Sequence, residues 1–448
     1  MTYNPDVAPL TWQQERFWHW NRGELFWDTT SGGAVKIPVS IELERAEPVA
    51  WVDNLASTLT TLSPLNTRID PSGSATQDLG GRGPKPEGNL VLYGNDEQEV
   101  RRGIFSPPMA LSNPALRMGA VVDSRGLVAS INLVLCHSAT DGAAVGLLAG
   151  FIAKHHKGQT PAETIRLSDL LTAQRGPVGR NVSARAMSYN ARLLASLPSY
   201  PFARFRRLAG SQENLYTRID MHVPGLASAS FRVARAQGVS PASVLVAALA
   251  IGFAHQSDSE IFFSKVTYSN RSGALGPFYG CAYHEGLMLL EVKDGERADV
   301  FLHNTFERWL RAMSNARYSS TALMGLLRLE EDSRGVQPRL RTGINLFWNG
   351  LDEAHIASTV IGSPSWEVGS RDWPDDSVDL ELKLVQKESD VTLEITMHDS
   401  LHESDELLLA ILGSVAAIDV LDREGTAMSV GGLWRTGPDF VRGEEGTP

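Results

Sequence analysis

The stretch LVASINLVLCHSATDGAAVGLLAGFIAKHHKG, residues 127–158, says more about the fold than any other part of the chain. Its first part, residues 127–136, is a short apolar run rich in strand-forming side chains. The apolar part after residue 142 predicts a helix, because Lys, His and Gly near residue 158 are typical of a helix end. The predicted order is strand, turn and helix, with the turn CHSATDG at residues 136–142.

Predicted helices and strands alternate through the rest of the chain. Residues 47–62 repeat apolar side chains on one helical face, and Pro48 occupies the expected first helical position. Gly238 ends a second helix, and Ser240 and Pro241 begin a third. Further strands are predicted at 261–270, 342–348, 378–386 and 391–398, and a closing helix at 403–421. This alternation predicts an α/β or α+β fold.

The length of the chain predicts two domains. A single hydrophobic core rarely grows beyond roughly 250–300 residues, and this chain has 448. We place the boundary so that the domains are residues 1–175 and 176–448. Pro198 and Pro201 follow soon after it and are typical of a crossover between lobes.

Composition argues against several classes of protein. The net charge of −11 provides no basic field for nucleic acid, and the Arg-rich segment at 201–210 is too local to change this. The two cysteines, Cys136 and Cys281, lie far apart without metal-ligand spacing. No apolar run approaches the roughly 18 residues that span a bilayer, and the N-terminus has no secretory pattern. We therefore expect a cytoplasmic protein without a nucleic-acid or membrane partner.

His137 is the candidate catalytic side chain. It directly follows a predicted buried strand, where a side chain is held rigidly and still faces a cleft. A neutral imidazole accepts a proton from an attacking amine or hydroxyl near neutral pH, or orients it. Asp141 has two open roles: it caps the following helix, or it turns inward and pairs with a cation.

Other reactive groups near the turn have simpler explanations. Cys136 is a candidate nucleophile, but neighbouring strand residues point to opposite faces, so we expect it to face away from His137. His155 and His156 stand at a helix end, where they complement the helix dipole. No second pair of ligands is spaced to join them, so no metal site is predicted.

Several segments in order resemble the condensation domains of nonribosomal peptide synthetases, within the chloramphenicol-acetyltransferase-like superfamily. CHSATDG is similar to the family's HHxxxDG motif, and LTWQQERFW at 10–18 to its opening SxAQxRxW signature. The resemblance continues to the closing strand pair and helix at 379–405, so it covers nearly the whole chain. Between these lie the other similar segments: TLSPLNTRI at 61–69, SNPALRMGAVV at 112–122, GVSPASVLVAALA at 238–250 and SNR at 269–271.

The resemblance implies a fold and a set of roles. The fold would be two acetyltransferase-like lobes in a V-shaped pseudo-dimer, with a tunnel that admits the phosphopantetheine arm of a carrier protein from each side. His137 matches the catalytically important second histidine, and Asp141 the aspartate that pairs with an arginine, for which Arg271 is the candidate. Gly142 lets the backbone turn into the helix. The family also implies a monomer without a bound cofactor.

The chain departs from the family pattern at two positions. Cys136 replaces the first histidine, a mainly structural position in the family, and Gly286 stands where an asparagine is usual. Tyr283, His284 and Glu285 form a polar cluster that either lines the tunnel or lies in an exposed loop. Trp348 and Asn349 lie near a strand that borders the tunnel in the family, and we expect them mainly to pack.

Three functions follow from these features. The first is amide or ester formation between a carrier-bound acyl thioester and an amine or alcohol, which is either a small molecule or itself carrier-bound. No carrier, adenylation or thioesterase domain follows in the sequence, so carriers are expected to act in trans. The second is a coenzyme-A-dependent acyltransferase, although no DFGWG-type motif lies near the C-terminus. The third is a degenerate domain that recruits a partner enzyme, which Cys136 and Gly286 favour.

Overall fold

The computed structural model describes most of the chain. The described residues are 7–22, 35–70, 75–79, 91–155, 165–198, 215–257, 259–271, 273–335, 340, 342–347, 356, 359–372, 380–398 and 406–436.

The chain forms two compact units. Unit 1 comprises Met1–Arg185, Ser269–His284 and Arg317–Gly325, and unit 2 comprises Ala186–Tyr268, Glu285–Ala316 and Leu326–Pro448. These units differ from the predicted domains 1–175 and 176–448, because unit 1 also includes two segments from later in the chain. Hydrogen bonds explain both: Asp141 accepts from the Ala282 N–H at 2.8 Å, and Glu15 accepts from the Ser319 hydroxyl at 2.6 Å.

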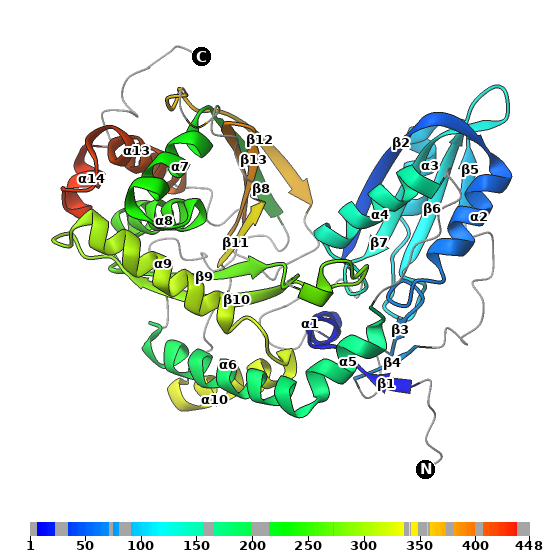
Figure 1. The fold of residues 1–448 in the computed structure, drawn as a ribbon, viewed down its shortest axis with the longest axis horizontal. Helices are drawn as coiled ribbons and strands as arrows, with labels where there is room; N and C mark the ends of the chain where they lie inside the picture. The colour runs from blue at the N-terminus through cyan, green and yellow to red at the C-terminus, as the bar shows by residue number, and fades with distance from the viewer. Residues whose placement is uncertain are drawn as a thin grey trace. The chain divides into compact units, whose positions relative to one another are not determined.

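Unit 1 is built on a four-stranded sheet in the order β2-β7-β6-β5, drawn in blue and cyan in Figure 1. Its strands are β2 Lys36–Pro48, β5 Val91–Gly94, β6 Leu116–Val122 and β7 Leu127–Cys136. A small sheet in the order β1-β4-β3 accompanies it, with β1 Val7–Pro9, β3 Arg68–Ile69 and β4 Thr76–Asp78. The helices are α1 Trp12–Asn21, α2 Val49–Leu59, α3 Glu97–Phe105, α4 Gly142–His155, α5 Leu167–Arg175 and the first part of α6 Pro177–Ser196.

Alternation along the strands assigns helices to the two faces of this sheet. A Cβ at Gly119 of β6 would meet Val100 of α3 at 2.5 Å, so α3 packs closely on the Gly119 face. Asn132 is paired with Gly119 across the ladder and therefore points to this face as well. Leu133 and Leu135 point to the opposite face, where they share one apolar core with residues of α2 and α4.

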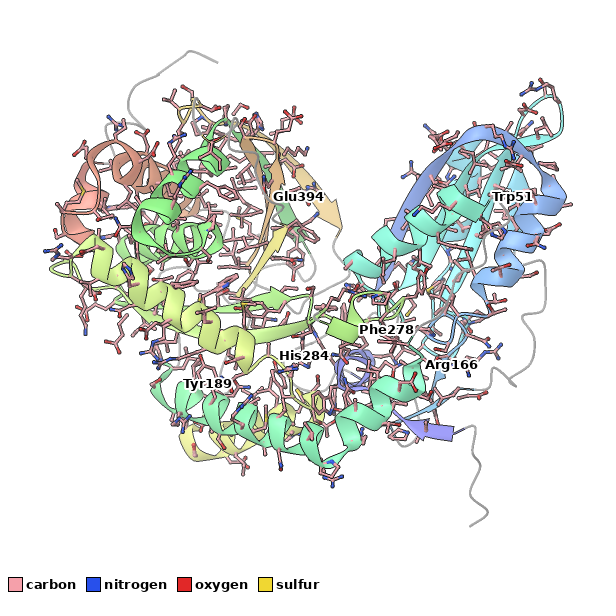
Figure 2. The ribbon with its side chains drawn as sticks, viewed as in Figure 1. Trp51, Arg166, Tyr189, Phe278, His284 and Glu394 are labelled. Atoms are coloured by element: carbon pink, nitrogen blue, oxygen red, sulfur yellow. The ribbon has the colours of Figure 1, made fainter. Side chains whose placement is uncertain are left out.

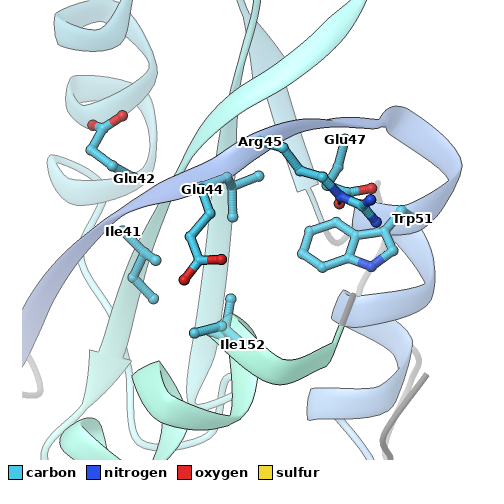
Figure 3. Close-up of a pocket in the computed structure, with 9 residues that line it drawn as sticks. Ile41, Glu42, Glu44, Arg45, Glu47, Trp51 and Ile152 are labelled. Atoms are coloured by element: carbon cyan, nitrogen blue, oxygen red, sulfur yellow. Dashed lines mark hydrogen bonds and ion pairs between the residues drawn. The ribbon is translucent and has the colours of Figure 1, made fainter. Parts of the chain in front are cut away.

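The edge strand β2 contains an irregularity. Its register to β7 shifts between Glu42 and Glu47, so alternation is interrupted there. Figure 3 shows the result: the carboxylate of Glu44 points toward Ile152 and Trp51, whereas Glu42 points away from them. The bulge thus opens a small hollow beside α4.

Unit 2 contains a seven-stranded sheet in the order β10-β9-β11-β13-β14-β8-β12. β11 runs parallel to β9 and β13, whereas β14 is antiparallel to β13 and β8. Glu394, labelled in Figure 2, accepts from Lys383 at 2.9 Å on a polar face of this sheet. The strands are β8 Leu215–Val223, β9 Ile261–Tyr268, β10 His284–Glu291, β11 Thr342–Phe347, β12 Ser365–Asp372, β13 Leu380–Lys387 and β14 Asp390–His398.

Helices cover the apolar face of the second sheet and complete one large core. α8 and α13 approach so closely that a Cβ at Gly252 would lie 2.1 Å from the Ala410 carbonyl oxygen. The helices are α7 Leu226–Gln237, α8 Pro241–Ser257, α9 Ala298–Ser314, α10 Ser320–Arg334, α13 Glu406–Glu424 and α14 Val430–Thr436, with the short 3₁₀ helix Gly273–Leu275. α10 begins in unit 1 and ends in unit 2.

Within the described part of the chain, no helix is by itself both long and apolar enough to cross a bilayer. Only α7 and α8 taken together, which are bent by 104° at their junction, meet the length and composition criteria.

The predicted α/β class is confirmed, and several predicted elements fall where the sequence placed them. β7 covers the predicted residues, and α7 ends before Gly238, whose φ of 65° is left-handed. Ser240 Oγ accepts from the Ser243 N–H at 3.1 Å and so caps α8 as expected. α2 begins at Val49 rather than Pro48, because Pro48 is extended and closes β2.

Candidate functional site

His137 lies directly after β7 and is fixed by two hydrogen bonds. Its backbone N–H donates to the Val35 carbonyl oxygen at 2.8 Å, and its ring Nδ1 lies 2.9 Å from the Thr140 carbonyl oxygen. A carbonyl oxygen only accepts, so Nδ1 must carry the hydrogen in this contact. Nε2 then carries no hydrogen, and its lone pair can accept a proton.

The turn that carries His137 is tied to the later segment 279–283. The N–H groups of Ala139 and Thr140 donate to the Cys136 carbonyl oxygen at 3.0 and 3.2 Å. The Cys281 N–H donates to the Ala139 carbonyl oxygen at 3.1 Å, and the Thr140 hydroxyl donates to that of Tyr279 at 3.3 Å. These bonds hold the imidazole in one orientation.

Two aromatic rings flank the imidazole. The ring centroids of Phe17 from α1 and of Tyr283 lie 5.2 and 5.0 Å from that of His137. The guanidinium of Arg16 lies 5.5 Å from the Tyr283 ring centroid. The histidine therefore stands between aromatic surfaces, with a cation nearby.

These surroundings favour the neutral imidazole. Burial lowers the pKa of His137 below its ordinary value, and the charge of Arg16 lowers it further. Hydrogen bonds to backbone groups of His137 and Thr140 oppose this effect only in part. At neutral pH, His137 is thus a base rather than a cation.

Asp141 combines the two roles that the sequence left open. Its Oδ1 accepts from the Ala144 N–H at 2.9 Å, which caps α4, and from Arg271 Nη2 at 2.7 Å. Its Oδ2 accepts from the N–H groups of Ala282 and Tyr283 at 2.8 and 3.0 Å. The side chains of Asp141 and Arg271 are 3% and 7% exposed, so this is a buried ion pair.

Arg271 anchors the rest of the later segment. Its Nη2 also donates to the Gly280 carbonyl oxygen at 2.7 Å, and its Nη1 donates to that of Phe278. Phe278 and His284, labelled in Figure 2, lie near the two ends of the segment that delivers Tyr283. Asp141 and Arg271 therefore hold the segment that carries Tyr283 against the turn that carries His137.

The opening helix α1 positions Phe17 and Arg16 through buried polar contacts. The Gln13 side chain donates to the Ala282 carbonyl oxygen at 3.2 Å and accepts from Gln174 at 3.0 Å. The Glu15 side chain is 3% exposed and accepts from Arg175 at 2.8 Å. Sequence reasoning did not assign α1 to the site. Consecutive polar residues, Gln13 to Arg16, inside an otherwise apolar segment were the signal that could have pointed to it.

Cys136 is packed in the core of unit 1. It is 3% exposed, and its Sγ lies 3.0 Å from the Ser138 hydroxyl oxygen. Burial raises the pKa of the thiol, which keeps it protonated and unreactive. Gly142 is the first residue of α4, as the predicted turn requires.

Of the predicted lining residues that the structure describes, Tyr283 lies beside His137, whereas His284 contacts Tyr318. His284 is 3% exposed; its Nε2 lies 3.0 Å from the Tyr318 carbonyl oxygen and its ring 4.2 Å from the Tyr318 ring centroid. These are the contacts of a core histidine satisfied by the backbone, and tunnel lining by His284 stays a prediction. Trp348 and Asn349 lie outside the described residues.

Gly286 is explained by packing. A Cβ at this position would lie 2.6 Å from the Ala312 carbonyl oxygen of α9 and 2.8 Å from the Tyr268 ring. An asparagine therefore does not fit here without moving α9.

Where the structure describes the chain, no three His, Cys, Asp or Glu side chains gather as metal ligands would. His155 packs against the Trp51 ring at 5.5 Å, and His156 is outside the described residues.

Comparison with known proteins gives a likeness of structure only. No protein-family model matches the chain, and no curated protein does. The first condensation domain of the calcium-dependent antibiotic synthetase, in complex with a substrate analogue, has a TM-score of 0.67 at 17% identity, covering 96% of this chain and 99% of that one. The condensation domain of the Monacolin K polyketide synthase MokA has a TM-score of 0.69 at 13% identity, covering 95% and 99%. The X-domain from teicoplanin biosynthesis, in its complex with OxyB, has 0.71 at 14% identity, covering 97% of each.

Proposed function

Because the chain has the fold of a condensation domain, we propose that it is a condensation-type acyltransferase. It joins an acyl group, carried as a thioester on the phosphopantetheine of a carrier protein, to an amine or alcohol. The observation that supports this most is the state of His137: a neutral imidazole, with Nδ1–H bound to Thr140 and Nε2 left as an acceptor.

His137 acts on the nucleophile in this proposal. The amine or alcohol donates a hydrogen bond to Nε2 while its lone pair attacks the thioester carbonyl carbon. Its proton passes to Nε2 as the bond forms. The C–S bond then breaks, the acyl group leaves as an amide or ester, and the sulfur takes up the proton as a free thiol. Atoms and charges balance without a further reactant.

The neighbours of His137 orient this step. Phe17 and Tyr283 keep the imidazole between two rings, which restricts its rotation and excludes water. Asp141 and Arg271 hold the backbone at Tyr283 and thereby support that wall.

Recruitment of a partner enzyme is the second candidate. Cys136 stands in place of the first motif histidine, and one structural neighbour is an X-domain in complex with OxyB. In this case the chain would bind a loaded carrier without transferring its acyl group. A coenzyme-A-dependent acyltransferase of the same fold differs only in the donor thioester.

One assay separates these candidates. The chain is mixed with a carrier protein that bears a labelled acyl thioester and with a panel of amines and alcohols, and the carrier is followed by intact-protein mass spectrometry. The proposal predicts loss of the acyl mass from the carrier together with a labelled amide or ester. Carrier binding without transfer would support recruitment, and transfer from acyl-coenzyme A alone would support a coenzyme-A-dependent acyltransferase.

A further inference from the structure

A second hollow in unit 1 is lined by the end of α3 and by β2 and β7. It encloses about 210 Å³ and is open to solvent on one side. None of its lining residues contributes to the contacts of His137 described above. Its lining includes Pro38, Ser40, Arg102, Phe105, Asn132 and Val134.

The floor of this hollow carries a buried hydrogen-bond donor. Asn132 is 2% exposed, and its Oδ1 accepts from the Ser40 hydroxyl at 2.7 Å. Its Nδ2 has no partner among the residues that the structure describes. A buried amide N–H without an acceptor is costly and therefore rare, so an acceptor atom supplied by a ligand would complete the site.

The rim of the hollow is positively charged. Arg102 forms no ion pair with any described residue, and Arg101 makes only a long contact of 3.8 Å with Glu97. Lys36 and Arg117 stand close by, but they donate to the carbonyl oxygens of Phe105 and Pro107 at 2.6 Å each. Those two cations are engaged by the end of α3, whereas Arg102 is available to an anion.

The remaining walls are apolar. Pro38 and Val134 face each other across the β2–β7 ladder, and the Phe105 ring is 43% exposed beside them. An exposed aromatic side chain next to aliphatic groups suits the body of a small organic molecule.

We propose that this hollow binds a small carboxylate with an apolar body. The guanidinium of Arg102 and the Nδ2 of Asn132 donate to the carboxylate oxygens, and the body packs against Pro38, Val134 and Phe105. A single buried donor suits a planar carboxylate better than a phosphate, whose additional oxygens would need further donors. The inference does not depend on the proposed acyl transfer.

Titration calorimetry of the full chain tests the proposal with benzoate and hexanoate as probes. We expect saturable binding of at least one of them with one site per chain, and much weaker binding of the matching amides, which keep the shape without the charge. Arg102→Gln should weaken binding at least tenfold. Arg125→Gln is the matched control, because Arg125 is 71% exposed and pairs with Asp123, so it should bind as the native chain does.

Asn132→Leu is a second variant for the same binding experiment. It removes the donor from the floor, so it should abolish binding while leaving the melting temperature unchanged or higher. Absence of binding by both probes at millimolar concentration would overturn the proposal. So would equal losses in Arg102→Gln and Arg125→Gln, or inorganic phosphate binding as tightly as benzoate. If Asn132→Leu does not fold, the Arg102 comparison still decides.

Discussion

At the scale of single residues, His137 derives its proposed chemistry from its backbone contacts. The Thr140 carbonyl oxygen accepts from Nδ1 and so fixes the tautomer of His137, and burial lowers the pKa of its imidazole. A base must be unprotonated to act, so the rate should fall only below a pH that lies under the ordinary histidine value of 6.5. The pH dependence of single-turnover acyl transfer measures this. An acidic limb at or above 6.5 would contradict the assignment.

Arg16 provides a more specific test of the same pKa. Its charge lowers the pKa of His137, so Arg16→Gln should move the acidic limb of the rate to higher pH. A purely structural role of Arg16 would change the rate at all pH values without moving the limb. Arg22→Gln is the control, because Arg22 follows the same helix but stacks on Trp18, at 4.7 Å from its ring centroid.

Cys136 separates non-covalent from covalent catalysis. Its thiol is buried and protonated, so Cys136→Ala and Cys136→Ser should keep most of the activity at a cost of about 1–2 kcal/mol in the free energy of unfolding. Denaturant unfolding and the transfer assay measure both effects. A covalent mechanism makes the opposite prediction: no turnover in either variant, and a stoichiometric acyl adduct on Cys136 in mass spectra taken without acceptor.

At the scale of elements, Asp141 connects β7, α4 and the segment before β10. Asp141→Asn breaks a buried ion pair as well as a cap, so it should cost about 3–5 kcal/mol in the free energy of unfolding. Asp96→Asn is the matched control, because Asp96 only caps the exposed start of α3, and it should cost about 1 kcal/mol or less. Urea unfolding distinguishes the two. Equal small losses would mean that the Arg271 contact contributes little.

The close approach of α9 leaves no room for a side chain at Gly286. Gly286→Asn would place a Cβ 2.6 Å from the Ala312 carbonyl oxygen, so we expect a lower melting temperature. Gly343→Asn on β11 is the control, because a Cβ there meets nothing within 4 Å. Similar melting temperatures for the two variants would show that α9 moves easily.

Local patterns in the sequence predicted many elements but few of their contacts. The apolar run 127–136 and the Gly238 helix end could be read directly, because alternation and capping are local properties. The approach of Phe17 and Tyr283 to His137 could not, since these residues are more than 100 positions from it in the chain. The pairing of Asp141 with Arg271 came from the resemblance to a family, not from spacing.

At the scale of the whole molecule, the fold is retained at very low sequence identity. Structures that are 13–17% identical cover 95% or more of this chain, yet no family model matches it. The backbone arrangement is thus similar while most side chains differ. The discontinuous unit 1 was not predicted, because segments 269–284 and 317–325 join it through contacts in space and not through their order in the sequence.

In the proposed reaction, His137 is the base for transfer of the acyl group. The single-turnover rate from a loaded carrier tests this, measured for the native chain and for His137→Ala with matched melting curves. We expect a rate lower by about 100-fold or more in His137→Ala, while the melting temperature is nearly unchanged. A folded His137→Ala variant that retains activity within a few-fold of the native chain would contradict it.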